Sequence, residues 1–269
     1  MSLTPVESGY APVNGLDMYY EIHGTGRSLV LLHGSLSGIG TSFGAVLPSL
    51  ARSRRVVAVE MQGHGRTADV DRPLTVEGMA EDVVALLGHL GVEEADLFGY
   101  SLGTAVAMKV AARHPGLVGR LVLASAGFHN GGLHPGVLDG IETLRPEDLA
   151  GSPFHEEYLA TAPHPDRWPA LVEKVKRLDA DFPEWTPEAV RAIAAPMLIA
   201  AGDSDIVRPE HVVEMFRLVG GGVPGDLTEL PASRLAILPG TTHLTIMHRA
   251  GLLVPMVESF LDGPVPALG

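Results

Sequence analysis

Short runs rich in Val, Ile and Leu recur along the chain, separated by Gly, Pro and polar residues. Runs of this kind are typical of strands that are buried on both faces of a parallel sheet. The pattern predicts strands over residues 18–23, 28–32, 55–59, 95–98, 121–124, 196–200 and 235–238.

Apolar positions with helical spacing lie between these runs. From Thr75, a residue type that caps helix N-termini, apolar residues repeat every three or four positions until Gly91. Further helices are expected over 102–113 and approximately 246–261. Because strands alternate with helices, the sequence predicts an α/β fold with a mostly parallel central sheet and helices on both faces.

Residues 128–190 interrupt this alternation with many prolines and several aromatic side chains. Prolines at such short intervals do not allow long helices or central strands. We therefore expect short helices that form a small cap, inserted into a core domain made of residues 1–127 and 191–269.

The net charge of the chain argues against proteins that bind nucleic acids. The chain has 269 residues, 46% of them hydrophobic, and its 19 Lys and Arg against 32 Asp and Glu give a formal net charge of −13. Such a surface repels nucleic acids and anionic membranes on average. The one basic cluster, Arg52, Arg54 and Arg55, is short, so no nucleic-acid partner is expected.

The chain has no cysteine, which excludes disulfides, zinc–thiolate sites and a cysteine nucleophile. Its first residues lack the basic and apolar regions of a secretory signal. No apolar run approaches the roughly 18 residues that a membrane span needs. We expect a cytoplasmic protein that does not associate with membranes, and the sequence leaves its oligomeric state open.

A Gly-x-Ser-x-Gly pattern centred on Ser101 gives the sharpest chemical signal. It lies directly between an apolar strand and an apolar helix. A turn this tight needs small neighbours, and it presents the serine hydroxyl at a helix N-terminus, where backbone N–H groups stabilise a developing anion. Ser101 is therefore the candidate nucleophile.

A serine hydroxyl needs a base, and the base needs an orienting carboxylate. His243 follows the strand 235–238 and is favoured as the base over His248, which is expected to fall in the last helix. Asp203 and Asp205 both follow the strand 196–200, and both are candidates for the acid. All these groups come after strands of a parallel sheet, where catalytic groups gather at the carboxyl edge.

These motifs resemble those of the α/β-hydrolase superfamily over nearly the whole chain. The family has an acid in a G-x-x-D-x-x-x-P pattern, matched by Gly202, Asp205 and Pro209, which favours Asp205 over Asp203. The resemblance also implies an oxyanion hole made by the backbone N–H groups of Ser35 and Leu102. The chain departs from the family pattern at Thr104 and Thr242, where relatives commonly have glycine.

The resemblance implies a Ser101–Asp205–His243 hydrolase that needs no cofactor and cleaves a small carboxylic ester, thioester or lactone. Carbon–carbon hydrolases, perhydrolase-type haloperoxidases and small-molecule receptors that keep the triad are the alternatives. Candidate substrate contacts are Gly34, Phe128, Trp168 and Trp185, although the aromatic residues could equally form the core of the cap.

Other polar residues near the predicted site are expected to support the fold and not to take part in catalysis. His33 and His64 stand in Gly-flanked turns and are expected to support the loops around the site, and Glu60 is expected to anchor a loop. No metal site is expected, because the cap histidines show no ligand spacing. These are His129, His134, His155 and His164.

Overall fold

The computed structural model describes residues 4–182 and 184–264, which form an eight-stranded sheet in the order β1-β2-β4-β3-β5-β6-β7-β8. The strands are β1 (Glu7–Val13), β2 (Leu16–His23), β3 (Ser28–Leu32), β4 (Arg55–Val59), β5 (Ala95–Tyr100), β6 (Val118–Ala124), β7 (Met197–Ser204) and β8 (Arg234–Thr242). The β1–β2 and β2–β4 pairs are antiparallel and the other pairs are parallel. The prediction of a mostly parallel sheet is confirmed.

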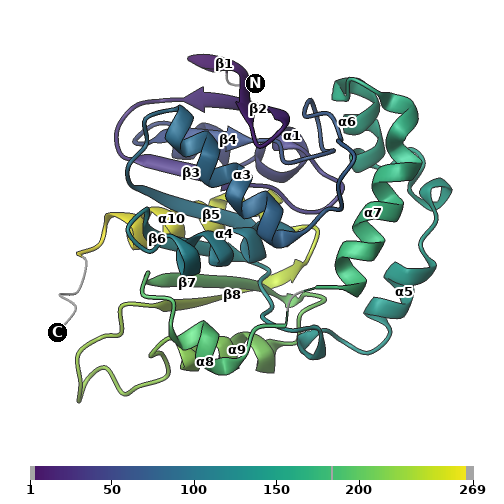
Figure 1. The fold of residues 1–269 in the computed structure, drawn as a ribbon. Helices are drawn as coiled ribbons and strands as arrows, with labels where there is room; N and C mark the ends of the chain where they lie inside the picture. The colour runs from purple at the N-terminus through teal and green to yellow at the C-terminus, as the bar shows by residue number, and fades with distance from the viewer. Residues whose placement is uncertain (1–3, 183, 265–269) are drawn as a thin grey trace.

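Helices cover both faces of the sheet, as predicted (Figure 1). One layer contains α3, α4 and α9, and the other contains α1, α2 and α10. Their bounds are α1 (Ile39–Phe43), α2 (Leu47–Leu50), α3 (Val76–His89), α4 (Leu102–Arg113), α9 (Pro209–Leu218) and α10 (Ala250–Asp262). The Thr75 hydroxyl caps α3 by accepting a hydrogen bond from the Gly78 N–H at 3.0 Å.

Alternate residues of the central strands enter the two cores. In β3, Val30 and Leu32 pack on the side of α3 and α4, while Leu29 and Leu31 pack on the side of α1, α2 and α10. Leu29 to Leu32 are all inaccessible to solvent. This explains why the central strands are continuous apolar runs.

Residues 128–182 and 184–190, called here the helical insertion, connect β6 to β7. The insertion contains α5 (Val137–Thr143), α6 (Pro153–Thr161), α7 (Trp168–Ala180), α8 (Pro187–Arg191) and the short 3₁₀ turns η1 (Asn130–Gly132), η2 (Pro146–Leu149) and η3 (Pro165–Arg167). Helices α5, α6 and α7 lie together beside the sheet (Figure 1). Prolines stand in the first turn of α6, α7 and α8, where a missing N–H costs nothing.

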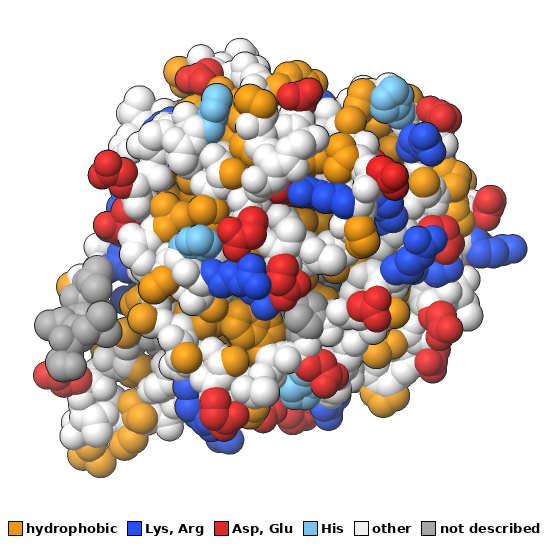
Figure 2. Space-filling view, viewed as in Figure 1, with side chains coloured by type: hydrophobic (Ala, Val, Ile, Leu, Met, Phe, Trp, Pro, Cys, Tyr) orange, Lys and Arg blue, Asp and Glu red, His pale blue; other side chains and the backbone are white. Residues whose placement is uncertain are grey.

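The surface mixes charges of both signs. On the face shown in Figure 2, Lys and Arg side chains lie among Asp and Glu side chains, with no continuous basic patch. Within residues 4–182 and 184–264, no helix is both long and apolar enough to cross a bilayer.

Candidate active site

The turn between β5 and α4 holds Ser101 in a strained backbone conformation, with φ 52° and ψ −119°. Neighbouring backbone atoms leave no room for a side chain at the two flanking glycines, Gly99 and Gly103. A Cβ on Gly99 would lie 2.3 Å from the Gly103 carbonyl oxygen, and a Cβ on Gly103 would lie 1.9 Å from that of Leu32. The chain can therefore turn this sharply only with glycine at both positions, and the turn projects the serine side chain.

Three side chains from separate loops form a hydrogen-bonded chain. The Ser101 hydroxyl donates to His243 Nε2 at 2.9 Å, and His243 Nδ1 donates to Asp205 Oδ1 at 2.8 Å. The loops follow β5, β7 and β8, so the parallel strands deliver all three groups to the same sheet edge. In this arrangement His243 can take a proton from Ser101 while Asp205 stabilises the resulting imidazolium.

Asp205 is buried and well supplied with donors. Its Oδ2 accepts from the Ser125 hydroxyl at 2.6 Å, and its Oδ1 also accepts from the Val207 N–H at 3.2 Å. Burial raises the pKa of Asp205, but the bonds from His243, Ser125 and Val207 outweigh burial and hold the pKa below its usual value. The other candidate, Asp203, instead accepts from two backbone N–H groups of β8 and forms no hydrogen bond with His243.

Two residues that share the cavity lining with Ser101 are the candidates for binding an oxyanion through their backbone N–H groups. Leu102 is the first residue of α4, and Ser35 follows β3; both residues line the same cavity as Ser101. In the described residues neither N–H donates to a protein acceptor. Gly34 lies against the serine, because a Cβ at Gly34 would stand 3.3 Å from the Ser101 Cβ. Free N–H groups so placed can stabilise an oxyanion.

A cavity of about 240 Å³ opens on Ser101 and His243. The sheet edge supplies one wall and the helical insertion the other, and the lining is mainly aliphatic. Its apolar residues include Leu36, Leu133, Leu138, Ile141, Leu144, Phe154, Val172, Val175, Phe182 and Ile206. The volume is below the roughly 300–1,000 Å³ of drug-sized sites.

Of the four predicted substrate contacts, Gly34 lines this cavity and the three aromatic residues do not. Phe128 is fully buried and stacks on His211, with ring centroids 4.2 Å apart. Trp168 packs against Tyr158 within the insertion, and Trp185 packs under the Lys109 ammonium. The aromatic contacts are therefore corrected: burying these large rings against neighbouring side chains removes more apolar surface from water than facing them into the cavity would.

Residues 29–254 match the sequence model of the alpha/beta hydrolase family. The chain belongs to this family. A 2-hydroxymuconate semialdehyde hydrolase from Pseudomonas sp. (strain CF600) is 32% identical over 219 residues, which cover 69% of this chain and 73% of the relative.

More distant relatives cover more of the chain. Pyrrolizixenacetamide deacetylase from Xenorhabdus hominickii is 27% identical over 262 residues, or 90% of this chain and 96% of the relative. Among solved structures, the enol-lactonase from Burkholderia xenovorans LB400 is 21% identical and covers 94% of this chain and 99% of its own, with a TM-score of 0.72. This similarity shows a shared fold.

In this alpha/beta hydrolase, buried polar groups hold the loop that carries Ser35. His33 donates from Nδ1 to the Gly34 carbonyl at 2.8 Å and accepts at Nε2 from the Met61 N–H at 2.9 Å. Glu60 accepts from the Arg66 backbone and guanidinium, at 2.6 and 2.9 Å. These contacts are the loop-supporting ones that the sequence predicts for His33 and Glu60.

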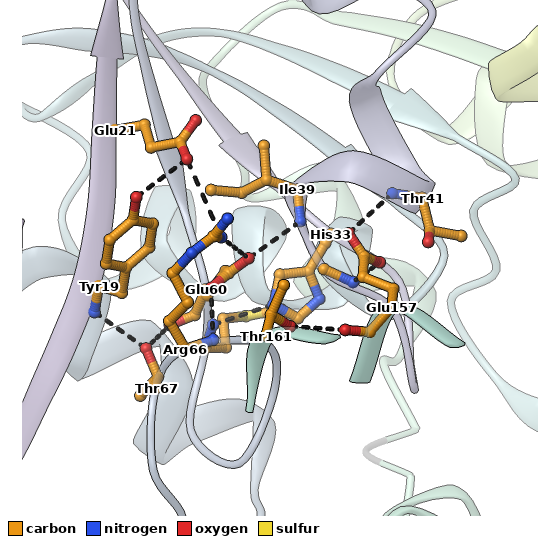
Figure 3. Close-up of polar contacts among 12 residues, drawn as sticks. Tyr19, Glu21, His33, Ile39, Thr41, Glu60, Arg66, Thr67, Glu157 and Thr161 are labelled. Carbon is orange, nitrogen blue, oxygen red and sulfur yellow. Dashed lines mark hydrogen bonds and ion pairs between the residues drawn. The ribbon is translucent and has the colours of Figure 1, made fainter. Parts of the chain in front are cut away.

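Glu157 reaches the same loop from the insertion. Its carboxylate accepts from the N–H groups of Gly38 at 2.8 Å and Thr41 at 3.0 Å. Figure 3 shows Glu157 and Glu60 both pointing toward the backbone at the start of α1, where Thr41 and Ile39 lie. The contact therefore ties the insertion to the segment just after Ser35.

Two further residues contact the triad and were not predicted from the sequence: Ser125 and Tyr100. Ser125 stands directly after β6, has a positive φ of 59° and bonds to Asp205. Tyr100 donates its hydroxyl to the His243 carbonyl at 3.0 Å. Asp205 and His243 were predicted because each follows a parallel strand. Ser125 also follows a parallel strand, so the same signal could have identified it.

Among the described residues, His129, His211 and Glu214 bring three candidate metal-ligand atoms within 4.8 Å of one another. However, His211 Nε2 accepts from the Phe128 N–H at 3.1 Å. The proton of the neutral ring therefore lies on Nδ1, the nitrogen that faces Glu214 at 3.7 Å. With one nitrogen bonded and the other protonated, the buried His211 has no free lone pair for an ion.

Proposed function

We propose that the protein is a cofactor-free serine hydrolase that cleaves a carboxylic ester, thioester or lactone through an acyl-enzyme. The observation that carries this proposal is the continuous hydrogen-bonded chain from Ser101 through His243 to Asp205 at the mouth of a small apolar cavity. Membership of the alpha/beta hydrolase family supports the same reaction class.

In the proposed reaction, Ser101 Oγ attacks the acyl carbon while its proton passes to His243 Nε2. The carbonyl oxygen becomes an oxyanion that the N–H groups of Ser35 and Leu102 stabilise. His243 then protonates the leaving oxygen or sulfur as the tetrahedral intermediate collapses to the acyl-enzyme. A water attacks this ester by the same steps in reverse, and Ser101 regains its proton.

The helical insertion serves in this proposal as a cap on a core domain made of the flanking segments. It contributes Leu138, Ile141, Val172 and Val175 to the cavity wall, so it sets the size and polarity of the acyl group that fits. Selectivity among substrates then depends on the insertion, and the sheet edge supplies the chemistry.

Carbon–carbon bond hydrolysis is the second candidate, favoured by the 32% identity to 2-hydroxymuconate semialdehyde hydrolase. The same serine, histidine and aspartate would act on a ketone carbonyl whose leaving group is a carbon. The two functions are distinguished by whether simple esters or vinylogous diketones are turned over faster at equal concentration.

Hydrolysis of p-nitrophenyl esters from acetate to dodecanoate tests the proposal, with Ser101→Ala measured in parallel. A cavity of about 240 Å³ predicts an optimum among the shorter acyl chains. Ser101→Ala is expected to reduce kcat by about 10⁴- to 10⁶-fold. Equal rates for the variant and the wild type would reject the serine mechanism.

A further inference from the structure

The cavity wall contains one carboxyl side chain within the described part of the lining, that of Asp179. Asp179 lies on α7, where Val172, Val175, Lys176 and Asp179 recur at helical spacing and all line the cavity. This face of α7 is therefore turned toward Ser101 and His243, and Asp179 is at its C-terminal end.

No described residue donates a hydrogen bond to the Asp179 carboxyl group, and none forms an ion pair with it. The Asn130 side-chain amide donates to its backbone carbonyl at 3.4 Å and not to its carboxyl group. Lys176, one turn earlier on the same helix, pairs with Glu173 instead at 3.2 Å. The other charged or titratable side chains that share the cavity are Tyr100, His129 and His243.

Other carboxyl groups inside this protein have basic partners: Glu60 pairs with Arg66, Asp82 with Arg72, and Asp96 with Arg27. Asp179 lacks one and is only partly exposed. Burial raises its pKa to about 7, although His243 lowers it. A carboxyl group kept without a partner beside aliphatic side chains destabilises the folded protein. A ligand that carries a positive charge would remove that penalty.

We propose that Asp179 is a specificity-determining residue that binds a protonated amine of the substrate. The inference rests on the proposed function and names its substrate class: an ester, thioester or lactone with an ammonium group near the scissile carbonyl. The spacing is short because Asp179, Ser101 and His243 line the same cavity of about 240 Å³. The net charge of −13 would draw such cations toward the protein.

Matched pairs of substrates test this assignment. With the amine in the leaving group, S-[2-(dimethylamino)ethyl] thioacetate is compared with S-(3-methylbutyl) thioacetate, which has the same shape without charge. With the amine in the acyl group, p-nitrophenyl 3-(dimethylamino)propanoate is compared with p-nitrophenyl 4-methylpentanoate. Thiol release can be followed with a chromogenic disulfide reagent, because the protein has no cysteine to react with it.

The readout is the ratio of kcat/KM for the charged substrate to that for its neutral match. A charge-assisted hydrogen bond predicts a ratio of roughly 10 to 100 in at least one pair for the wild type. Asp179→Asn should bring the ratio close to one, and Asp179→Glu should retain a preference for the charged substrate. Asp181→Asn removes the same charge two residues later on an exposed side chain and should leave the ratio unchanged.

A wild-type ratio near one in both pairs, with neutral esters hydrolysed, would overturn the role of Asp179 and leave the proposed function intact. An unchanged ratio in Asp179→Asn would overturn it as well. If Ser101-dependent turnover is absent altogether, the proposed function fails. Calorimetric binding of 3-methylbutylammonium to Ser101→Ala then tests Asp179 alone: affinity that falls at least 10-fold on adding Asp179→Asn supports its role, and equal affinity rejects it.

Discussion

Glu157 does not line the cavity, yet replacing it with Gln is expected to slow catalysis. The Glu157 carboxylate accepts two hydrogen bonds, from the N–H groups of Gly38 and Thr41. It also lies close over this segment, because a Cβ on Gly40 would stand 2.6 Å from its Oε1. A glutamine side chain has one acceptor oxygen, so its NH₂ group would face the second N–H.

The magnitude follows from these contacts. A hydrogen bond to a charged group contributes about 1.5–3 kcal/mol, and the partial exposure of Glu157 places it at the lower end, about 2 kcal/mol. These two hydrogen bonds hold the backbone segment that follows Ser35. Without them the segment can shift and carry the Ser35 N–H away from the oxyanion. If all of this ~2 kcal/mol is lost from transition-state stabilisation, kcat/KM falls about 30-fold. If only about a third of it is lost there, kcat/KM falls about 3-fold.

The assay combines ester hydrolysis with hydrogen exchange. Glu157→Gln should lower kcat/KM by about 3- to 30-fold and speed exchange at the amides of Gly38 and Thr41. Glu156→Gln is the matched control, since it removes the same charge from the neighbouring exposed position, and it should change either readout by less than 2-fold. A Glu157→Gln variant with wild-type kcat/KM and unchanged exchange would refute the reasoning.

Three other predictions concern the acid and the buried imidazoles. Asp205→Asn should lower kcat about 10⁴-fold by allowing the wrong histidine tautomer, while Asp203→Asn should change it only a few-fold; similar losses in both would contradict the geometry. Ser125→Ala removes a 2.6 Å bond to Asp205 and should raise the pKa of that carboxyl and cost about 10-fold in kcat, which a pH–rate profile would detect. Burial lowers the pKa of His33 to about 4 and that of His64 to about 3, so below pH 6.5 the unfolded chain binds more protons than the folded one. The free energy of unfolding should therefore fall as the pH drops from 6.5 toward 4, by up to about 1.4 kcal/mol per pH unit for each ring. Urea unfolding at pH 7 and pH 5 checks this, and a His64→Gln variant with an undiminished slope would count against it.

The central strands and long helices could be predicted because burial imposes a strong pattern on them. Strands β3 and β4 and helix α4 have the predicted bounds. The edge strand β1 was not predicted, because it is largely exposed and carries no apolar run. Helices α1 and α2 were missed since they have only five and four residues, too few for a helical repeat.

Sequence position predicted which residues meet at the sheet edge, because the carboxyl ends of parallel strands converge whatever the loops between them do. Ser101, Asp205 and His243 come together for this reason. The same rule does not extend to the insertion. Whether Trp168 or Val172 faces the cavity depends on the rotation of α7 about its own axis. This rotation cannot be predicted from the spacing of apolar residues along α7, because both residues are apolar and both are buried.

Labelling with a fluorophosphonate tests the central claim most directly. The hydrogen-bonded chain predicts one covalent adduct per protein by intact mass, located on Ser101, absent in Ser101→Ala and strongly slowed in His243→Ala. A folded wild-type protein that forms no adduct, or that is labelled equally well after Ser101→Ala, would contradict the account.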